Sequence, residues 1–315
     1  MGGARRAGRG ALPAGDRLRP ADGRRRPADH PQQQGAARAF RVRGRTGAAR
    51  PADAADLVER GGDVGAVNGR IALVTGGGSG LGRASSLALL SAGWTVVLAG
   101  RRKEALEETA ALADAGPDRV LAVPADIRSP EEVTRLFDAV RDRYGRLDLL
   151  FNNAGAAAPR RPITETPFAD WNRVLDTIVT GSFLCAREAF RLMSTQTPQG
   201  GRIINNGAPS AHVPRPNSAA YTAAKHAVLG LTKVLALDGR PYGISCGQID
   251  VGNVAPPDGR PQPAAMQADG TMAVEATIPV ERFTEALLLM ASQPPDTVIQ
   301  SLVVLPATMP FVGRG

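Results

Sequence analysis

Tyr221 and Lys225 lie four residues apart in the segment YTAAK, and together they could move a proton. A phenol has a pKa of about 10 and is a poor base at neutral pH. An ammonium group close by favours the phenolate, and a spacing of four residues places both side chains on one face of a helix. The pair is therefore a candidate for acid–base catalysis. The alternative is a buried structural tyrosine beside a solvated lysine.

A glycine-rich segment, TGGGSGLG, follows the apolar run RIALVT and has the pattern T-G-x-x-x-G-x-G. Glycines at a strand-to-helix turn let the backbone approach a pyrophosphate, and the helix N-terminus offers free N–H groups to it. A lone glycine-rich turn is a weak signal, but its place at the first such turn favours dinucleotide binding. The candidate residues here are Gly76, Ser79, Gly80, Leu81 and Gly82.

Arg101 and Arg102 follow the next apolar run, WTVVLAG, where an NAD-binding protein would carry an acid for the ribose 2′-hydroxyl. A guanidinium suits a 2′-phosphate as a bidentate donor. The sequence therefore favours NADP(H), with NAD(H) as the alternative cofactor. Two solvated loop arginines are the other interpretation.

Apolar runs and helical patterns alternate from Arg70 onward. This alternation predicts an α/β fold: a Rossmann-type, doubly wound parallel sheet of about seven strands flanked by helices, in a single domain over residues 69–315. Ligands in such sheets bind beyond the carboxyl ends of the strands. Strands are expected near 70–75, 94–100, 119–126, 147–155, 202–206, 243–249 and 297–304, and helices near 81–93, 103–116, 129–145, 168–193, 219–238 and 279–292.

The excess charge lies at the front of the chain. Fifteen arginines and seven acidic residues within residues 1–70 account for the whole formal net charge of +8. Residues 1–68, rich in Arg, Ala, Gly and Pro, cannot bury enough apolar surface to offset their ordering entropy, so we expect a disordered extension. Nucleic-acid contact is the alternative to an extension without a role. The balanced remainder, with no apolar run near about 20 residues, predicts a cytoplasmic protein with no nucleic-acid or membrane partner.

These motifs, with AD at 125–126 and NNAG at 152–155, resemble the short-chain dehydrogenase/reductase family in order and spacing over about residues 70–315. The resemblance implies an NADP-preferring oxidoreductase that interconverts a carbonyl and an alcohol on a small-molecule substrate. Tyr221 would be the acid/base, and Lys225 would hold the nicotinamide ribose and lower the Tyr221 pKa. A homodimer or homotetramer would form through the long helices near 168–193 and 219–238. Further cofactor contacts would come from Asp126, Ile127, Asn153, Ala154, Gly155 and Gly252.

The sequence departs from the family pattern in the reacting half of the site. Ala208 replaces the family's catalytic Ser, 13 residues before the Tyr, and Ile178 replaces the Asn of the long helix. Loss of one hydrogen-bond donor at a reacting oxygen commonly costs about 10²–10³ in rate. Ser210 could partly substitute if the backbone is extended there, because alternate residues then point to the same side. After the sixth strand, Val251 and Pro256 stand where the family has Pro and Thr.

These losses leave two other functions open: a cofactor-binding protein without redox turnover, or a non-redox enzyme that reuses the pocket. His212, in the loop after the fifth strand, is a further candidate substrate contact, and His226 is expected to be structural. The segment 253–273 would form a mobile lid whose apolar content favours an apolar substrate. Cys185 and Cys246 are expected to be buried thiols. No spacing predicts a metal site.

Overall fold

A computed structural model of the chain describes residues 69–113, 115–157, 159–256, 262–267 and 269–311. The extension predicted for residues 1–68 lies outside these residues, as does part of the predicted lid, at 257–261 and 268. No helix in the described part of the chain is long and apolar enough to cross a membrane.

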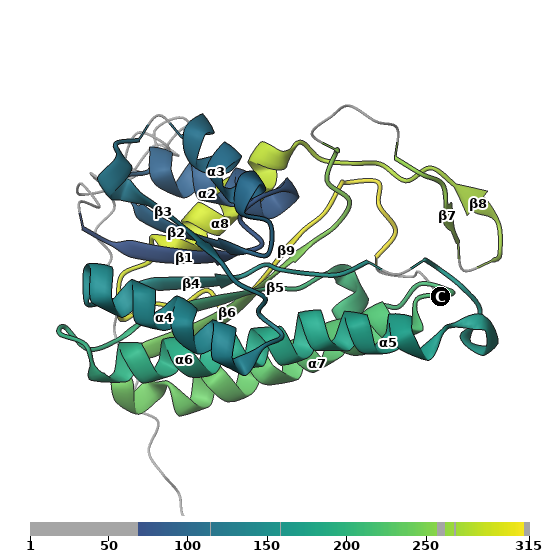
Figure 1. Cartoon of the computed structure of the whole chain (residues 1–315). Coiled ribbons are helices and arrows are strands. Elements are labelled where there is room, and N and C mark those ends of the chain that lie inside the picture. Colours follow the sequence, from purple (N-terminus) through teal and green to yellow (C-terminus); the bar gives the residue numbers. More distant parts are fainter. Residues whose placement is uncertain (1–68, 114, 158, 257–261, 268, 312–315) are drawn as a thin grey trace, which may run out of the picture. The chain divides into compact units, whose positions relative to one another are not determined.

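A seven-stranded sheet, parallel throughout, forms the centre of the fold (Figure 1), with the strand order β3-β2-β1-β4-β5-β6-β9. The predicted α/β Rossmann-type fold is therefore confirmed. The strands are runs of apolar residues because helices cover both faces of the sheet. They are β1 Ile71–Thr75, β2 Thr95–Gly100, β3 Val120–Pro124, β4 Leu149–Asn152, β5 Gly201–Asn206, β6 Ile244–Val251 and β9 Ser301–Val304.

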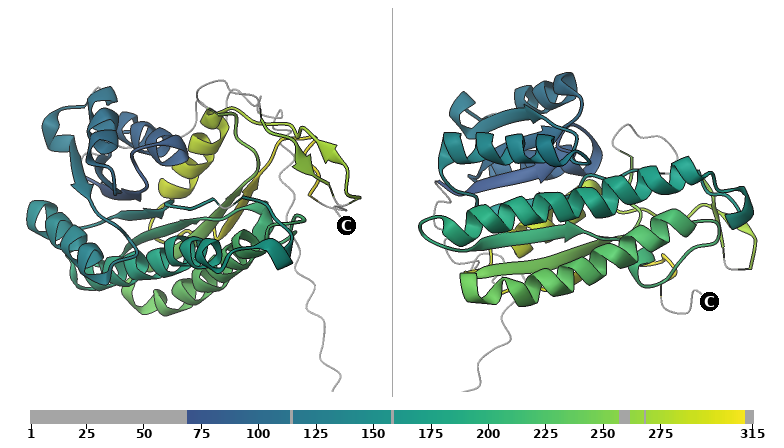
Figure 2. Two further views of the ribbon diagram at one scale, coloured as in Figure 1. Left: turned by 45° about the vertical axis from the view of Figure 1, so that its right-hand side comes forward. Right: turned by 60° about the horizontal axis from the view of Figure 1, so that its bottom comes forward.

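Helices cover the two faces in separate groups (Figures 1 and 2). On one face, α2 (Gly80–Ser91), α3 (Lys103–Leu112) and α8 (Val280–Ala291) pack over an apolar cluster that includes Leu89, Leu106 and Phe283. On the other face lie α4 (Pro130–Tyr144), α6 (Gly181–Thr195) and α7 (Ala219–Asp238). The strand order reverses between β1 and β4, and a ligand crevice is expected at this edge.

The helix predicted over 168–193 is interrupted. The structure has α5 (Phe168–Leu175), a π-helical turn η3 (Asp176–Thr180) and then α6. Ile178 lies in this turn, is 2% exposed, and packs with Val174 and Ala224. π-Helical turns inside α-helices are frequent at functional sites. Sequence periodicity missed the turn because the apolar pattern continues across it.

Short elements complete the described part of the chain. A two-stranded antiparallel ribbon, β7 (Ala265–Met266) with β8 (Met272–Ala273), lies within the predicted lid segment. Cys185 and Cys246 are buried free thiols, as predicted. Short 3₁₀ turns occur at Pro117–Arg119 (η1), Ile163–Glu165 (η2), Pro209–Ala211 (η4) and Arg240–Tyr242 (η5).

Candidate functional site

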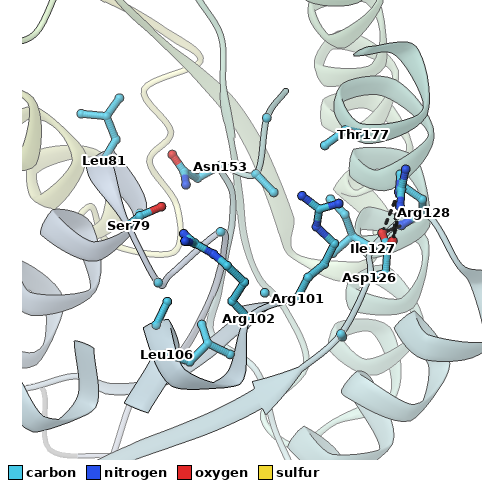
Figure 3. A pocket seen from close by; sticks show the side chains of 18 residues that line it. Ser79, Leu81, Arg101, Arg102, Leu106, Asp126, Ile127, Arg128, Asn153 and Thr177 are labelled. Atoms are coloured by element: carbon cyan, nitrogen blue, oxygen red, sulfur yellow. Dashed lines mark hydrogen bonds and ion pairs between the residues drawn. The ribbon is translucent and has the colours of Figure 1, made fainter. Parts of the chain in front are cut away.

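A cleft opens at the carboxyl ends of β1, β2 and β4, where the strand order reverses (Figure 3). Most of the residues predicted to bind a cofactor line it. Four others lie elsewhere: Gly80 lines an adjoining hollow, Tyr221 and Gly252 line a second cavity, and Lys225 is buried on α7. The predicted residues that line the cleft are Gly76, Ser79, Leu81, Gly82, Arg101, Arg102, Asp126, Ile127, Asn153, Ala154 and Gly155.

Gly82 allows the first turn of α2 to lie against the glycine-rich loop. A Cβ atom there would lie 2.1 Å from the Gly76 carbonyl oxygen and 2.6 Å from Asn153 Nδ2. Asn153 Nδ2 donates to the Thr75 carbonyl at 2.9 Å, and Thr75 Oγ1 accepts the Asn153 and Ala154 N–H groups at 2.9 and 3.0 Å. These bonds join the ends of β1 and β4. The result is a backbone cradle that a dinucleotide pyrophosphate would fit.

Arg101 and Arg102 extend from the end of β2 into the cleft, and in the view of Figure 3 they lie between Ser79 and Asp126. Among the described residues, neither guanidinium has a side-chain hydrogen bond or ion pair. Arginines without a partner in a cleft suit a phosphate group, because each presents a fork of donors.

Arg128 is a further cleft residue, which the sequence reasoning missed. Its Nε donates to Asp126 Oδ1 at 2.9 Å and its Nη2 to Asp126 Oδ2 at 2.5 Å (Figure 3). Hydrogen bonding from Arg128 lowers the pKa of the Asp126 carboxyl. Asp126 therefore stays ionised, and Arg128 supplies a third guanidinium to the cleft. The signal available in the sequence was that Arg128 follows Asp126 by two residues, across a turn.

Tyr221 and Lys225 lie one turn apart on α7, as predicted, with Lys225 Nζ 5.5 Å from the centroid of the Tyr221 ring. Lys225 Nζ donates to the Asn206 carbonyl oxygen at 2.7 Å, and Asn206 Nδ2 donates to Asn153 Oδ1 at 3.0 Å. These two bonds connect the Tyr221 side of the site with the cleft. Tyr221 and Lys225 can therefore act on the same reacting group.

The predicted lowering of the Tyr221 pKa is wrong for the protein alone. Burial raises the Tyr221 pKa to about 12, and burial lowers the Lys225 pKa to about 8. Desolvation disfavours the charged form of each group, and it outweighs the opposing charges of Arg215 and Arg160 at Tyr221 and of Asp250 at Lys225. A protonated phenol is the form that can donate a proton to a carbonyl oxygen.

Ala208 lines the same cavity as Tyr221, at the position where the family carries Ser. Behind it lies Asp250, fully buried, which the sequence reasoning passed over. Asp250 Oδ1 accepts the Ala208 N–H at 2.7 Å and Gln248 Nε2 at 2.8 Å, and Asp250 Oδ2 lies 3.0 Å from His212 Nε2. The signal was an acidic residue within an apolar run that predicts a buried strand. A buried charge requires partners, so such a residue indicates a built polar site.

Ser210 and His212 differ from their predictions. Ala208 is extended, but the backbone then enters the η4 turn, so the extended path assumed for Ser210 is wrong. Ser210 nevertheless lines the cavity with Tyr221. His212 pairs with Asp250, lies against Phe311 with ring centroids 6.3 Å apart, and is absent from the lining of that cavity. His226 is exposed on α7, and its ring nitrogen contacts the Thr222 carbonyl.

Comparisons with known proteins place this geometry in a family. A family model described as short chain dehydrogenase matches residues 70–265. The chain is 36% identical over 180 residues to a 3beta-hydroxysteroid dehydrogenase of Mediterraneibacter gnavus, covering 57% of this chain and 64% of that protein. It is 34% identical over 243 residues to a cis-4-hydroxycyclohexanecarboxylate dehydrogenase of Sinomonas cyclohexanicum, covering 75% and 94%.

One of the solved structures that are similar to this chain has a bound cofactor. The 3-ketoacyl-(acyl-carrier-protein) reductase from Brucella melitensis, complexed with NADH, superposes with a TM-score of 0.67 at 26% identity, over 76% of this chain and 98% of that one. The family model covers more than half of the chain, including the glycine-rich loop, Tyr221 and Lys225. The chain therefore belongs to the short-chain dehydrogenase/reductase family of oxidoreductases.

Proposed function

We propose that this protein is an NADP(H)-dependent oxidoreductase that interconverts a carbonyl and an alcohol on a small-molecule substrate. The observation that carries the proposal is the Tyr221 phenol in a cavity, one helical turn from a buried Lys225 that is connected through Asn206 to the dinucleotide cleft. An acid–base group next to a cofactor site is what carbonyl reduction requires.

The cleft residues fit a dinucleotide. Gly76 and Gly82 would admit its pyrophosphate, and Arg101 and Arg102 would hold a 2′-phosphate, which supports NADP(H) over NAD(H). When bound, the cofactor supplies or accepts the hydride. Arg128 would border its adenine end together with Asp126.

The chain's own residues handle the substrate oxygen and its proton. Tyr221, protonated at neutral pH, would donate its proton to the oxygen of the carbonyl as the alcohol forms, and would take it back in the reverse direction. Lys225, with its ammonium near the ring, would stabilise the phenolate produced. Ser210 is the hydroxyl that lines this cavity near Ala208 and could contact the substrate oxygen. The apolar part of the lining, including Pro209, would hold the substrate body.

Assembly through α6 and α7 is part of the proposal, as a homodimer or homotetramer. Both helices carry exposed apolar side chains: Phe183 on α6 is 47% exposed, and Val234 and Leu237 on α7 are 52% and 56% exposed. Covering such side chains is favourable, since apolar area removed from water stabilises association. Sedimentation of the wild type against Val234→Glu tests this point, and a wild-type monomer would contradict it.

Titration with NADPH and NADH, followed by absorbance at the reduced-nicotinamide band with a panel of ketones and aldehydes, tests the function. We expect tighter NADPH binding and consumption on at least one carbonyl. Tyr221→Phe should lower turnover by about 10²-fold or more while NADPH still binds, because it removes only the proton donor. Equal turnover by the variant would contradict the role of Tyr221.

A cofactor-binding protein without redox turnover is the second candidate, favoured by Ala208, Ile178 and Val251 in the reacting half of the site. Tight NADPH binding with no consumption across the panel would select it, or a non-redox enzyme that reuses the cavity.

A further inference from the structure

The cavity that holds Tyr221 contains two guanidinium groups, those of Arg160 and Arg215. Arg215 is fixed by an ion pair with Glu275, and the two side chains are only 9% and 5% exposed. Glu275 also accepts Asn253 Nδ2 at 2.7 Å and Gln267 Nε2 at 3.3 Å. The charge of Glu275 is therefore committed to Arg215 and to the amides that surround it.

Arg160 has no such partner in the part of the chain that the structure describes. Among the described residues its guanidinium makes no hydrogen bond or ion pair, and none of the residues that line this cavity is an Asp or Glu. Partial burial lowers the Arg160 pKa, the charge of Arg215 lowers it further, and the charge of Glu275 opposes these two effects. Arg160 is exposed to solvent, and it brings a cation to a cavity whose described lining residues include no carboxylate, which leaves a place for a negative group beside it.

The position of Arg160 relates this charge to the reaction. Arg160 and Arg215 both act electrostatically on the Tyr221 phenol and both favour its phenolate. Tyr221 and the two arginines line one cavity, so a small substrate whose oxygen meets Tyr221 would share that cavity with both guanidinium groups. The fork of an arginine matches the two oxygens of a carboxylate.

We propose that the substrate carries a carboxylate, which Arg160 binds while the reacting carbonyl or alcohol faces Tyr221. The substrate class is thus an oxo acid and its hydroxy acid. This assignment rests on the proposed function. It deepens the expectation of an apolar substrate, because the apolar lining would hold the carbon skeleton between the two polar ends.

Binding experiments test the assignment without any turnover. The full chain, saturated with NADP⁺, is titrated calorimetrically with cyclohexanecarboxylate, hexanoate and benzoate, and with the carboxamide of each. The wild type should bind at least one acid about tenfold to hundredfold tighter than its amide, the range of a charged hydrogen-bonded pair. Arg160→Gln should remove that preference.

Arg161→Gln is the matched control, since Arg161 is the next arginine along the chain and does not line this cavity. The Arg161→Gln variant should still bind the acid more tightly than its amide. Equal binding of acids and amides, no binding of any acid, or an equal loss in Arg161→Gln would each overturn the assignment.

A kinetic comparison separates this inference from the proposed function. The ratio of kcat/KM for 4-oxocyclohexanecarboxylate to that for its methyl ester should exceed about tenfold in the wild type and fall toward one in Arg160→Gln. A protein that prefers acids in calorimetry but oxidises or reduces nothing would refute the redox function and keep the carboxylate site. Turnover of the ester at the same rate as the acid would refute the carboxylate site and keep the redox function.

Discussion

Restoring a hydroxyl at Ala208 should raise the rate of carbonyl reduction. Ala208 lines the cavity of Tyr221, and its backbone is held by the bond from its N–H to Asp250 Oδ1 at 2.7 Å. Ala208→Ser adds one donor on a fixed backbone next to the proton donor. One preorganised donor at a reacting oxygen is worth about 10²–10³ in rate.

The nearby carboxylate of Asp250 reduces this gain. A carboxylate has about four lone-pair sites, and the Ala208 N–H, Gln248 and His212 lie against Asp250. The remaining site could capture the new hydroxyl. If Asp250 held the hydroxyl about nine-tenths of the time, a gain of about 10² would fall to about tenfold. We therefore expect kcat/KM to rise tenfold or more, equivalent to about 1.4 kcal/mol of transition-state stabilisation.

The assay is steady-state reduction of the best carbonyl found in the panel, followed by loss of the reduced-nicotinamide absorbance. Ala208→Cys is the matched control, because a thiol fills similar space and is a weaker donor. A gain with Ser and little gain with Cys would assign the effect to the hydrogen bond. No gain with any substrate, in a variant whose unfolding midpoint is unchanged, would refute an oxidoreductase limited by its missing donor.

Three further perturbations follow from the geometry. Arg101→Ala with Arg102→Ala should weaken NADPH binding about tenfold or more and leave NADH within about twofold, measured by fluorescence titration; parallel losses would count against a 2′-phosphate site. Burial lowers the Lys225 pKa from 10.5 to about 8, so between pH 8 and pH 10 the unfolded chain binds more protons than the folded one. Over that window the free energy of unfolding should rise by about 2 kcal/mol relative to Lys225→Met, a comparison in which both proteins carry Tyr221; a constant difference in denaturant titrations would contradict the shift. Gly207→Ala should destabilise the fold by about 1–3 kcal/mol in the same titrations, because a Cβ there would lie 1.9 Å from a buried carboxylate oxygen; an unchanged midpoint would show that the strand can shift.

The sheet was predictable because its signals are local. Each strand is an apolar run followed by a turn, and α4 is marked by Ser129, whose Oγ accepts the Glu132 N–H at 3.2 Å, and by Gly145 at its C-terminal end with φ 71°. The π-helical turn at Asp176–Thr180 has no such signal, since the apolar pattern runs through it. The turn is followed by Gly181, where a Cβ would lie 2.5 Å from Ile127 Cδ1, so the helix approaches a residue far away in the sequence at this point.

The candidate site was predictable only in part, for the same reason. Tyr221 and Lys225 share a helix face, so their spacing was sufficient. Asp250 meets Ala208 across 42 residues and His212 across 38, and no local pattern joins them. The pKa of Tyr221 depends on how dry its surroundings are, which sequence spacing does not report.

The polar losses around Tyr221 have the character of a rebuilt site rather than an eroded one. Erosion leaves buried polar groups without partners, at about 1–3 kcal/mol each. Among the described residues Asn206 Oδ1, beside the Lys225 bond, is such an atom, but the groups behind Ala208 are paired. Asp250 is fully buried and has donors at both carboxylate oxygens, and it fits only because Gly207 carries no Cβ. Ile178, in place of an amide, is packed in an apolar cluster with the ring of Tyr221 at its edge. A buried carboxylate costs several kcal/mol unless its surroundings are arranged for it, so the arrangement behind Ala208 favours a working site with altered polarity.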